Sequence, residues 1–242
     1  MNSVGLTDIG KIRIINEDSI YISDKSVGPL DNLYIVADGM GGHNAGDIAS
    51  KEAVERTVNK IKNYPKSQNL IVDKLLKEVI KEVNTEIYNL SKIDKTLSNM
   101  GTTFVVLTIF RNKIYIANIG DSRVYILNNN EINQLTIDHS KVYELYLDGE
   151  YTKEEINFLP NKNEITRALG YDSNLLVDTF IYDNNFDKIL MCTDGLTNEL
   201  FDKEILEISN EYLDIYELSE QLLNKANEKG GKDNISLILI EE

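Results

Sequence analysis

The chain has 242 residues, of which 42% are hydrophobic and 27% are charged, and its formal net charge is −15. Such a composition supplies a full globular core, and without a Pro/Ser linker or a low-complexity tract it predicts one domain over residues 1–242. The acidic surplus argues against a nucleic-acid binder and disfavours docking on anionic lipid, because no basic patch could dominate that field.

The N-terminal half alternates short strand patterns with two long amphipathic helices. We expect strands at Ser3–Asp8, Ser19–Ser23 and Leu33–Ala37, the last of them apolar throughout and followed by a glycine-rich turn. Apolar residues at helical spacing then predict helices over Ala45–Asn63 and Leu70–Leu90.

The C-terminal half is a run of strands interrupted by one polar segment, Asp138–Asn163, which holds a short helical pattern and Pro160 and predicts a surface flap. Successive strands with tight turns indicate antiparallel pairing. Helix pairs grouped between runs of strands favour an α+β arrangement of antiparallel sheets covered by helices. The strands expected are Thr102–Phe110, Lys113–Asn118, Arg123–Leu127, Glu131–Leu135, Leu176–Tyr182, Ile189–Thr193 and Asn234–Glu241, with helices at Asp202–Ser209 and Asp214–Lys229.

Two of the apolar strands end abruptly in Asp-Gly, at Asp38-Gly39 and Asp194-Gly195, and Gly120-Asp121 closes a similar run. A carboxylate at the mouth of a buried strand is costly unless something positive meets it, and several converging carboxylates repel one another. Their natural companion is a hard divalent cation, which prefers oxygen ligands. Zinc is disfavoured because only His43 and His139 could supply imidazole.

Asp38 is the strongest candidate ligand, as a carboxylate that bridges two metals. Gly39 has no side chain, so its backbone carbonyl can approach an ion closely. Asp194 supplies a second carboxylate, and Asp233 places a third just before the last strand. Any one of these acids alone would more often merely end a strand or stabilise a turn, and that interpretation weakens when the pattern recurs three times.

The loop between the first two strands carries charges beside this cluster. Asp8, Glu17 and Asp18 lie near the first strands and could join or support the metal ligands. Arg13 stands four and five positions before Glu17 and Asp18, where its guanidinium could hold two phosphate oxygens. The alternative for Arg13 is a structural ion pair with Glu17 or Asp18.

These residues favour a metal-dependent phosphatase. A phosphate ester carries roughly two negative charges near neutral pH, and Mg²⁺ or Mn²⁺ would neutralise the field of the carboxylates and activate a water. A cysteine phosphatase needs Cys-x5-Arg, but Cys192 has Asn198 at the arginine position. Asp38 lacks the Asp-x-Asp pattern of phosphoaspartyl enzymes, and Gly39–Gly46 lacks the Gly-Lys-[Ser/Thr] ending of a nucleotide loop.

Eight motifs in order, spanning essentially the whole chain, resemble the metal-dependent protein phosphatase family, the type 2C Ser/Thr phosphatases, in its compact bacterial form. The motifs are Arg13-Ile-Ile-Asn16-Glu17-Asp18, Val36-Ala-Asp38-Gly39-Met40-Gly41-Gly42-His43-Asn44-Ala45-Gly46, Met100-Gly101-Thr102-Thr103, Asn118-Ile-Gly120-Asp121-Ser122-Arg123, Leu135-Thr136-Ile-Asp138-His139-Ser140, Ile165-Thr166-Arg167-Ala168-Leu169-Gly170, Thr193-Asp194-Gly195-Leu196 and Gly231-Lys-Asp233-Asn234.

The resemblance implies a four-layer α-β-β-α sandwich with a binuclear Mn²⁺/Mg²⁺ centre between two antiparallel sheets. It implies a small flap at about residues 140–167, which suits substrate gating. By this resemblance, Asp38, Asp194 and Asp233 would bind the first metal, and Asp38 with the Gly39 carbonyl would bind the second. Asp121 with Asp194 would form a weaker third site. Glu17 and Asp18 would hold metal-bound waters, and Arg13 would hold the phosphate.

The general acid is the one role without a residue. Animal members of the family have a histidine directly after the Asp-Gly, whereas Met40 stands there in this chain, as in the bacterial branch. His43 is nearby but equally suits a loop histidine that bonds the backbone, so a water on the third metal is the preferred donor. We expect His139 to be structural.

The expected function is hydrolysis of phosphoserine and phosphothreonine in proteins, opposing a bacterial Ser/Thr kinase. Two alternatives remain open: a phosphatase dedicated to one regulatory phosphoprotein, and a catalytically dead binding module, although no expected ligand is missing. A single cysteine, and an N-terminus without a basic or an apolar signal region, predict a cytoplasmic protein. We expect a monomer whose partners are phosphorylated proteins, with no nucleic acid and no membrane insertion.

Overall fold

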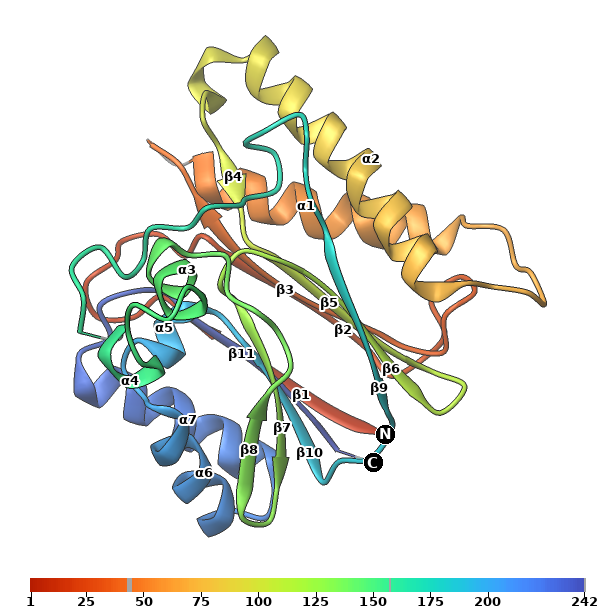
Figure 1. The fold of residues 1–242 in the computed structure, drawn as a ribbon. Helices are drawn as coiled ribbons and strands as arrows, with labels where there is room; N and C mark the ends of the chain where they lie inside the picture. The colour runs from red at the N-terminus through yellow and green to blue at the C-terminus, as the bar shows by residue number, and fades with distance from the viewer. Residues whose placement is uncertain (43–44, 157, 242) are drawn as a thin grey trace.

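The computed structural model describes residues 1–42, 45–156 and 158–241. Two sheets lie face to face and helices cover the outer face of each (Figure 1). All pairings within the sheets are antiparallel, which confirms the α-β-β-α sandwich. One sheet contains, in spatial order, β1 (Asn2–Asp8), β11 (Ile235–Glu241), β10 (Lys188–Cys192), β7 (Arg123–Asn128) and β8 (Glu131–Gln134). The other contains β2 (Asp18–Ser23), β3 (Leu33–Met40), β5 (Phe104–Phe110), β6 (Lys113–Ile119) and β9 (Asp178–Asp183), with β4 (Gly101–Thr102) beside β3.

The helices are divided between the two outer faces. α1 (Ala45–Lys62) and α2 (Val72–Ile93) pack on the sheet of β3 and β6, and the short helix η1 (Lys95–Leu97) follows α2. On the opposite face, α5 (Asp194–Thr197) and α7 (Ile215–Lys229) contact β11, and α6 (Asp202–Glu211) contacts β8. None of the helices that the structure describes has both the length and the apolar character needed to cross a bilayer.

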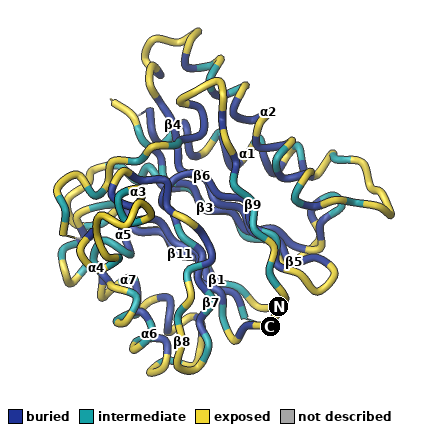
Figure 2. The backbone as a smooth tube through the Cα atoms, viewed as in Figure 1, coloured by how far each residue is buried: buried dark blue, intermediate teal, exposed yellow. Residues whose placement is uncertain are grey.

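Three apolar layers hold the sandwich together. One layer lies between the two sheets, and the other two lie between each sheet and its helices. β5 and β11 touch two of these layers, so every residue of β5, and every residue of β11 except Glu241, is buried (Figure 2). Burial on both faces is the reason that these strands read as continuous apolar runs rather than as alternating patterns.

Most expected elements form within one or two residues of their predicted ends. The turn at Arg111-Asn112 is tight, with φ of 48° and 61°, as a two-residue hairpin requires. One expected strand, Thr102–Phe110, is instead broken at Thr103. The backbone N–H of Thr103 donates to the Asp38 carbonyl at 2.9 Å, and its hydroxyl accepts from the Asp38 N–H at 3.0 Å. Thr103 therefore leaves the ladder to hold the backbone of Asp38.

The segment expected to form the flap contains two short helices among its described residues, where one was expected. These are α3 (Lys141–Leu147) and α4 (Lys153–Ile156), which pack on each other beside α5 (Figure 1). The Ser140 side chain accepts from the Tyr143 N–H, which starts α3 in the usual way for a helix N-cap. A small apolar cluster of Val142, Tyr143 and Ile156 joins the two helices.

Candidate metal centre

Five aspartates reach one end of the sandwich from different strands. Asp18 and Asp38 face each other across the β2–β3 ladder. Asp194 follows the end of β10, and Asp233 precedes β11, the strand that pairs antiparallel with β10. Asp121 follows the end of β6. The pKa of Asp38 is raised well above its usual range, first by burial and then by the charges of the other four carboxylates. These charge effects show that the five aspartates lie near one another, and all five were candidates from the sequence.

The backbone of Asp38 is fixed on both sides of its side chain. Thr103 bonds the N–H and the carbonyl of Asp38, and the Thr102 hydroxyl donates to the same carbonyl at 2.9 Å. The Thr103 hydroxyl lies 2.8 Å from that of Ser122, which comes from the β6–β7 loop that also carries Asp121. This network ties the position of Asp38 to that of Asp121.

Asp194 is held by its own helix. The Asn198 side chain donates to the Asp194 carboxylate at 2.8 Å. Burial raises the pKa of Asp194, and the charge of Asp233 raises it further, whereas hydrogen bonds with Asp38 and Asn198 oppose the rise. A hydrogen bond between two carboxyl groups needs a proton when no cation is bound. Asp38 and Asp194 therefore lie within hydrogen-bonding reach of each other.

One carboxylate oxygen of Asp18 has no hydrogen-bond partner within the described part of the chain, and it could accept a hydrogen bond from a metal-bound water. Its Oδ2 accepts from the Thr193 hydroxyl at 3.0 Å, whereas its Oδ1 is buried with no partner among the residues described. Burial raises the pKa of Asp18 to about 7, despite hydrogen bonds from Ser236 and Thr193, and the charges of Asp194 and Asp233 add to the rise. A buried, unpaired carboxylate oxygen is costly unless a donor reaches it. A water on a neighbouring cation would be such a donor.

Gly39 cannot be replaced by a residue with a side chain. A Cβ at Gly39 would lie 2.0 Å from the Gly46 carbonyl oxygen and 2.6 Å from that of Glu17, and both are backbone atoms. The Gly39 N–H also donates to the Glu17 carbonyl at 3.0 Å. The structure thus adds a packing reason to the one expected from sequence, which was close approach of the carbonyl to an ion.

Arg13 stands at the mouth of the cluster with its side chain 46% exposed. Its Nη2 donates to Asp233 Oδ2 at 2.8 Å, and its Nη1 lies 3.7 Å from Glu17 Oε2. The ion pair with Glu17 was one of the expected alternatives, whereas the shorter one with Asp233 was not expected. Asp8 is not among the carboxylates whose charges raise the pKa of Asp38, and its Oδ1 accepts from the Gly10 N–H and from the Asn227 side chain of α7.

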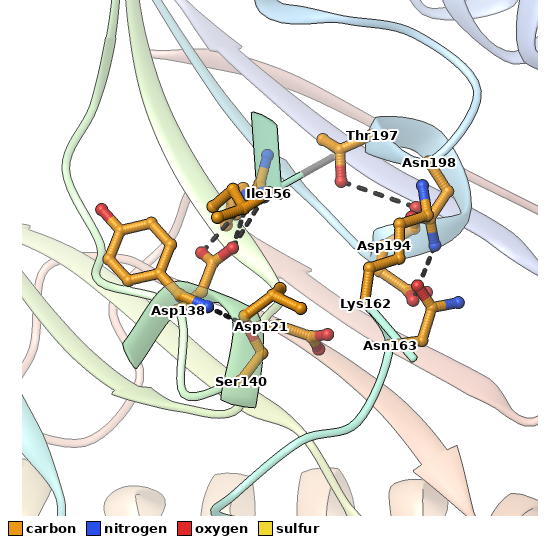
Figure 3. Close-up of a pocket in the computed structure, with 12 residues that line it drawn as sticks. Asp121, Asp138, Ser140, Ile156, Lys162, Asn163, Asp194, Thr197 and Asn198 are labelled. Atoms are coloured by element: carbon orange, nitrogen blue, oxygen red, sulfur yellow. Dashed lines mark hydrogen bonds and ion pairs between the residues drawn. The ribbon is translucent and has the colours of Figure 1, made fainter. Parts of the chain in front are cut away.

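Asp121 and Asp194 line a small cavity of about 30 Å³ (Figure 3). A cavity of this size has room for a water molecule, which needs roughly 10–15 Å³. Burial raises the pKa of Asp121 well above its usual range, and the charge of Asp194 adds to it. Lys162 of the flap lies beside Asp194 (Figure 3), and burial lowers the pKa of its ammonium group. Sequence reasoning missed Lys162 and Asn198, because neither belongs to a strand end or an acidic pattern.

His139 supports the loop that carries Asp121. Its Nδ1 accepts from the Gly120 N–H at 3.0 Å, so its proton lies on Nε2, which faces Asp178 Oδ2 at 3.1 Å. Burial lowers the pKa of His139, so the ring is neutral and suited to these bonds. Its partners fit the structural role expected from sequence. His43, the other histidine, lies outside the described residues.

The cluster is not a closed cage. Within residues 1–42, 45–156 and 158–241, no group of three or more His, Cys, Asp or Glu side chains is arranged to hold a metal ion by itself. The fit to a cation therefore rests on three observations: the mutual electrostatics of the carboxylates, the unpaired Asp18 oxygen and the cavity between Asp121 and Asp194. All the side-chain donors are oxygens, which suits Mg²⁺ or Mn²⁺.

Without metal, the protein should lose stability as the pH rises from 5 to 7.5. The folded-state pKa of Asp18 is about 7 and its ordinary value is 3.8. The stability that the protonated carboxyl contributes to the fold is therefore fully present below about pH 4 and is lost as the pH rises towards 7. We expect the Tm of EDTA-treated protein to fall by at least about 5 °C over this interval, and Mn²⁺ to reverse the trend. Asp18→Asn should flatten the fall, and an unchanged slope in that variant would contradict the assignment.

Comparison with known proteins gives one consistent result. A family model described as protein phosphatase 2C matches residues 12–239. The serine/threonine phosphatase Stp of Listeria monocytogenes serotype 4b is 41% identical over 239 residues, which are 97% of this chain and 93% of that protein. Protein phosphatase PhpP of Streptococcus pneumoniae serotype 2 is 35% identical over 248 residues, covering 97% of this chain and 95% of that protein. The crystal structure of serine/threonine phosphatase Stp1 from Staphylococcus aureus has a TM-score of 0.92 at 34% identity, covering 99% and 94% of the two chains.

Proposed function

The chain belongs to the protein phosphatase 2C family, and from this premise we propose that it hydrolyses phosphoserine and phosphothreonine in proteins at the carboxylate cluster. One observation carries the proposal. Four aspartates from separate strand ends raise the pKa of a fifth, Asp38, at one end of the sandwich. A protein gains nothing in stability from such mutual repulsion, so the cluster is there to hold cations.

Mn²⁺ or Mg²⁺ is the cofactor in this proposal, two per chain with a weaker third. Bound there, the cations would lower the pKa of a coordinated water and neutralise charge on the phosphate. Asp38 would bridge the first two, with Asp194 and Asp233 on the first and the Gly39 carbonyl on the second. Asp121 with Asp194 would hold the third, which suits the small cavity between them.

Several residues of the chain act around these ligands. Asp18 and Glu17 would accept hydrogen bonds from waters on the bound cations, Asp18 through its unpaired Oδ1. Arg13 binds the phosphate by exchanging Asp233 for two phosphate oxygens, a change that its half-exposed position allows. Thr103 and Asn198 hold Asp38 and Asp194 in place.

Residues 1–242 act as a single catalytic domain in this proposal, with the flap at about 140–167. Its partners are phosphorylated proteins and the bacterial Ser/Thr kinase that modifies them, so the enzyme works in signalling. Cys192 is free and buried, which suits a cytoplasmic location. All three acids expected at the first metal are in the chain, which disfavours a catalytically dead binding module.

Removal of metal tests the proposal directly. EDTA-treated protein should hydrolyse a phosphothreonine peptide at least about 100-fold more slowly than protein with Mn²⁺, because the bound cations would activate the attacking water. Adding Mn²⁺ or Mg²⁺ should restore the rate, measured as released phosphate. Full activity after EDTA, with metal content confirmed as zero, would reject metal-dependent chemistry at this cluster.

A further inference from the structure

A second, larger cavity of about 440 Å³ lies between the flap and the start of α6. Tyr143, Ile156 and Phe158 of the flap form part of its wall, and Phe201, directly before α6, also lines it. Its volume is within the range of pockets that bind small ligands, roughly 300–1,000 Å³. We call this cavity the flap pocket.

The flap pocket adjoins the small cavity of the candidate metal centre. Arg123, Tyr143, Ile156 and Thr197 line both this cavity and the small cavity that holds Asp121 and Asp194. In Figure 3, Ile156 and Thr197 lie beside the acidic cavity. The shared residues therefore place the flap pocket next to the cavity that Asp121 and Asp194 line.

Two aromatic rings of the flap pocket are left open to solvent. Phe158 is 78% exposed and Phe201 is 44% exposed, and their ring centroids are 6.1 Å apart. Exposed aromatic rings around a cavity next to an active site are typical of ligand-binding surfaces. The charges at the rim are of both signs and partly paired, since Lys153 lies 3.2 Å from Asp202. The pocket is thus suited to an apolar group rather than to a second phosphate.

We propose that the flap pocket binds an apolar side chain of the phosphoprotein substrate, within three residues of the phosphorylated residue. An extended peptide advances about 3.3 Å per residue, and the shared wall keeps the two cavities within the reach of so short a segment. This inference rests on the proposed function and adds to it a preference among phosphopeptides. Phe158 and Phe201 act as specificity residues, away from the reacting atoms.

The test compares two sets of phosphothreonine peptides. The first has serine at every flanking position, and in the second Leu or Phe replaces one of these serines at a time. With Mn²⁺, one apolar substitution should raise kcat/KM by about 10-fold or more, as expected for an apolar side chain in a hydrophobic pocket. Phe158→Ser and Phe201→Ser should abolish that gain and leave the serine-flanked peptide within twofold of wild type. Phe158→Leu should keep most of the gain.

Tyr216→Ser is the matched control, because Tyr216 is a 55% exposed aromatic on α7 that does not line the flap pocket. It should leave the gain unchanged. Equal rates for all peptides, or a gain that survives both phenylalanine substitutions in folded variants, would overturn the inference alone. No hydrolysis even of the serine-flanked peptide would overturn the proposed function, and this inference with it.

Discussion

Asp38→Asn should reduce Mn²⁺-supported hydrolysis of a phosphothreonine peptide by at least about 1,000-fold, a loss of about 4 kcal/mol of transition-state stabilisation at 1.36 kcal/mol per tenfold. Asp38 is the carboxylate on which the charges of four other aspartates act, so it lies at the centre of the cluster. Asparagine keeps the shape of the side chain and removes the negative charge. Metal affinity, measured by calorimetry, should fall together with the rate.

The same substitution should stabilise the metal-free protein. Burial and neighbouring charges raise the pKa of Asp38, so at pH 7.5 its ionised form opposes folding. We expect the Tm of EDTA-treated Asp38→Asn to exceed that of EDTA-treated wild type, and Mn²⁺ to stabilise the variant less than the wild type. Asp183→Asn, which removes an exposed carboxylate paired with Lys113, is the control and should change neither quantity. A variant that is less active but equally stabilised by Mn²⁺ would show that Asp38 is not a metal ligand.

The sequence predicted the fold well because strands buried on both faces leave a strong local signal. β5 and β11 are apolar at almost every position, and α2 repeats its apolar residues at helical spacing. The aspartates could be recognised for the same reason, since Asp38 and Asp194 each interrupt such a buried run. These signals lie within a few neighbouring residues and need no knowledge of distant contacts.

The remaining features depend on contacts between distant segments. Thr103 leaves its strand because it bonds Asp38, 65 positions away. Arg13 pairs with Asp233 across 220 positions, whereas its sequence neighbour Glu17 lies farther from the guanidinium. Lys162 reaches Asp194 only through the path of the flap, whose two helices are too short for a periodic pattern. Each of these positions is set by tertiary packing, to which local propensity contributes little.

Asp138→Ala should destabilise the protein by about 3–5 kcal/mol, because it leaves the Arg123 guanidinium without its charge partner. Arg123 donates to both oxygens of Asp138, at 3.1 and 2.9 Å from Nε and 2.6 Å from Nη2. The Asp138 side chain is 4% exposed and that of Arg123 is 17% exposed, so water cannot replace the lost bonds freely. Gln134, which donates to Asp138 at 2.7 Å, would lose its partner too. Urea denaturation with metal present measures the change.

The pair joins the start of the flap to β7, so its removal also tests how the flap is anchored. Replacing both partners by apolar residues, Arg123→Met with Asp138→Leu, should recover much of the stability, because the cost of a broken buried pair comes mainly from the stranded charge. If Asp138→Ala costs less than about 1 kcal/mol, the pair behaves as an exposed ion pair, and burial of Arg123 beside the carboxylate cavity would need another explanation. A double variant that is no more stable than Asp138→Ala would instead show that the Tyr125 and Gln134 bonds to this pair carry the stability, and that the flap is held through them.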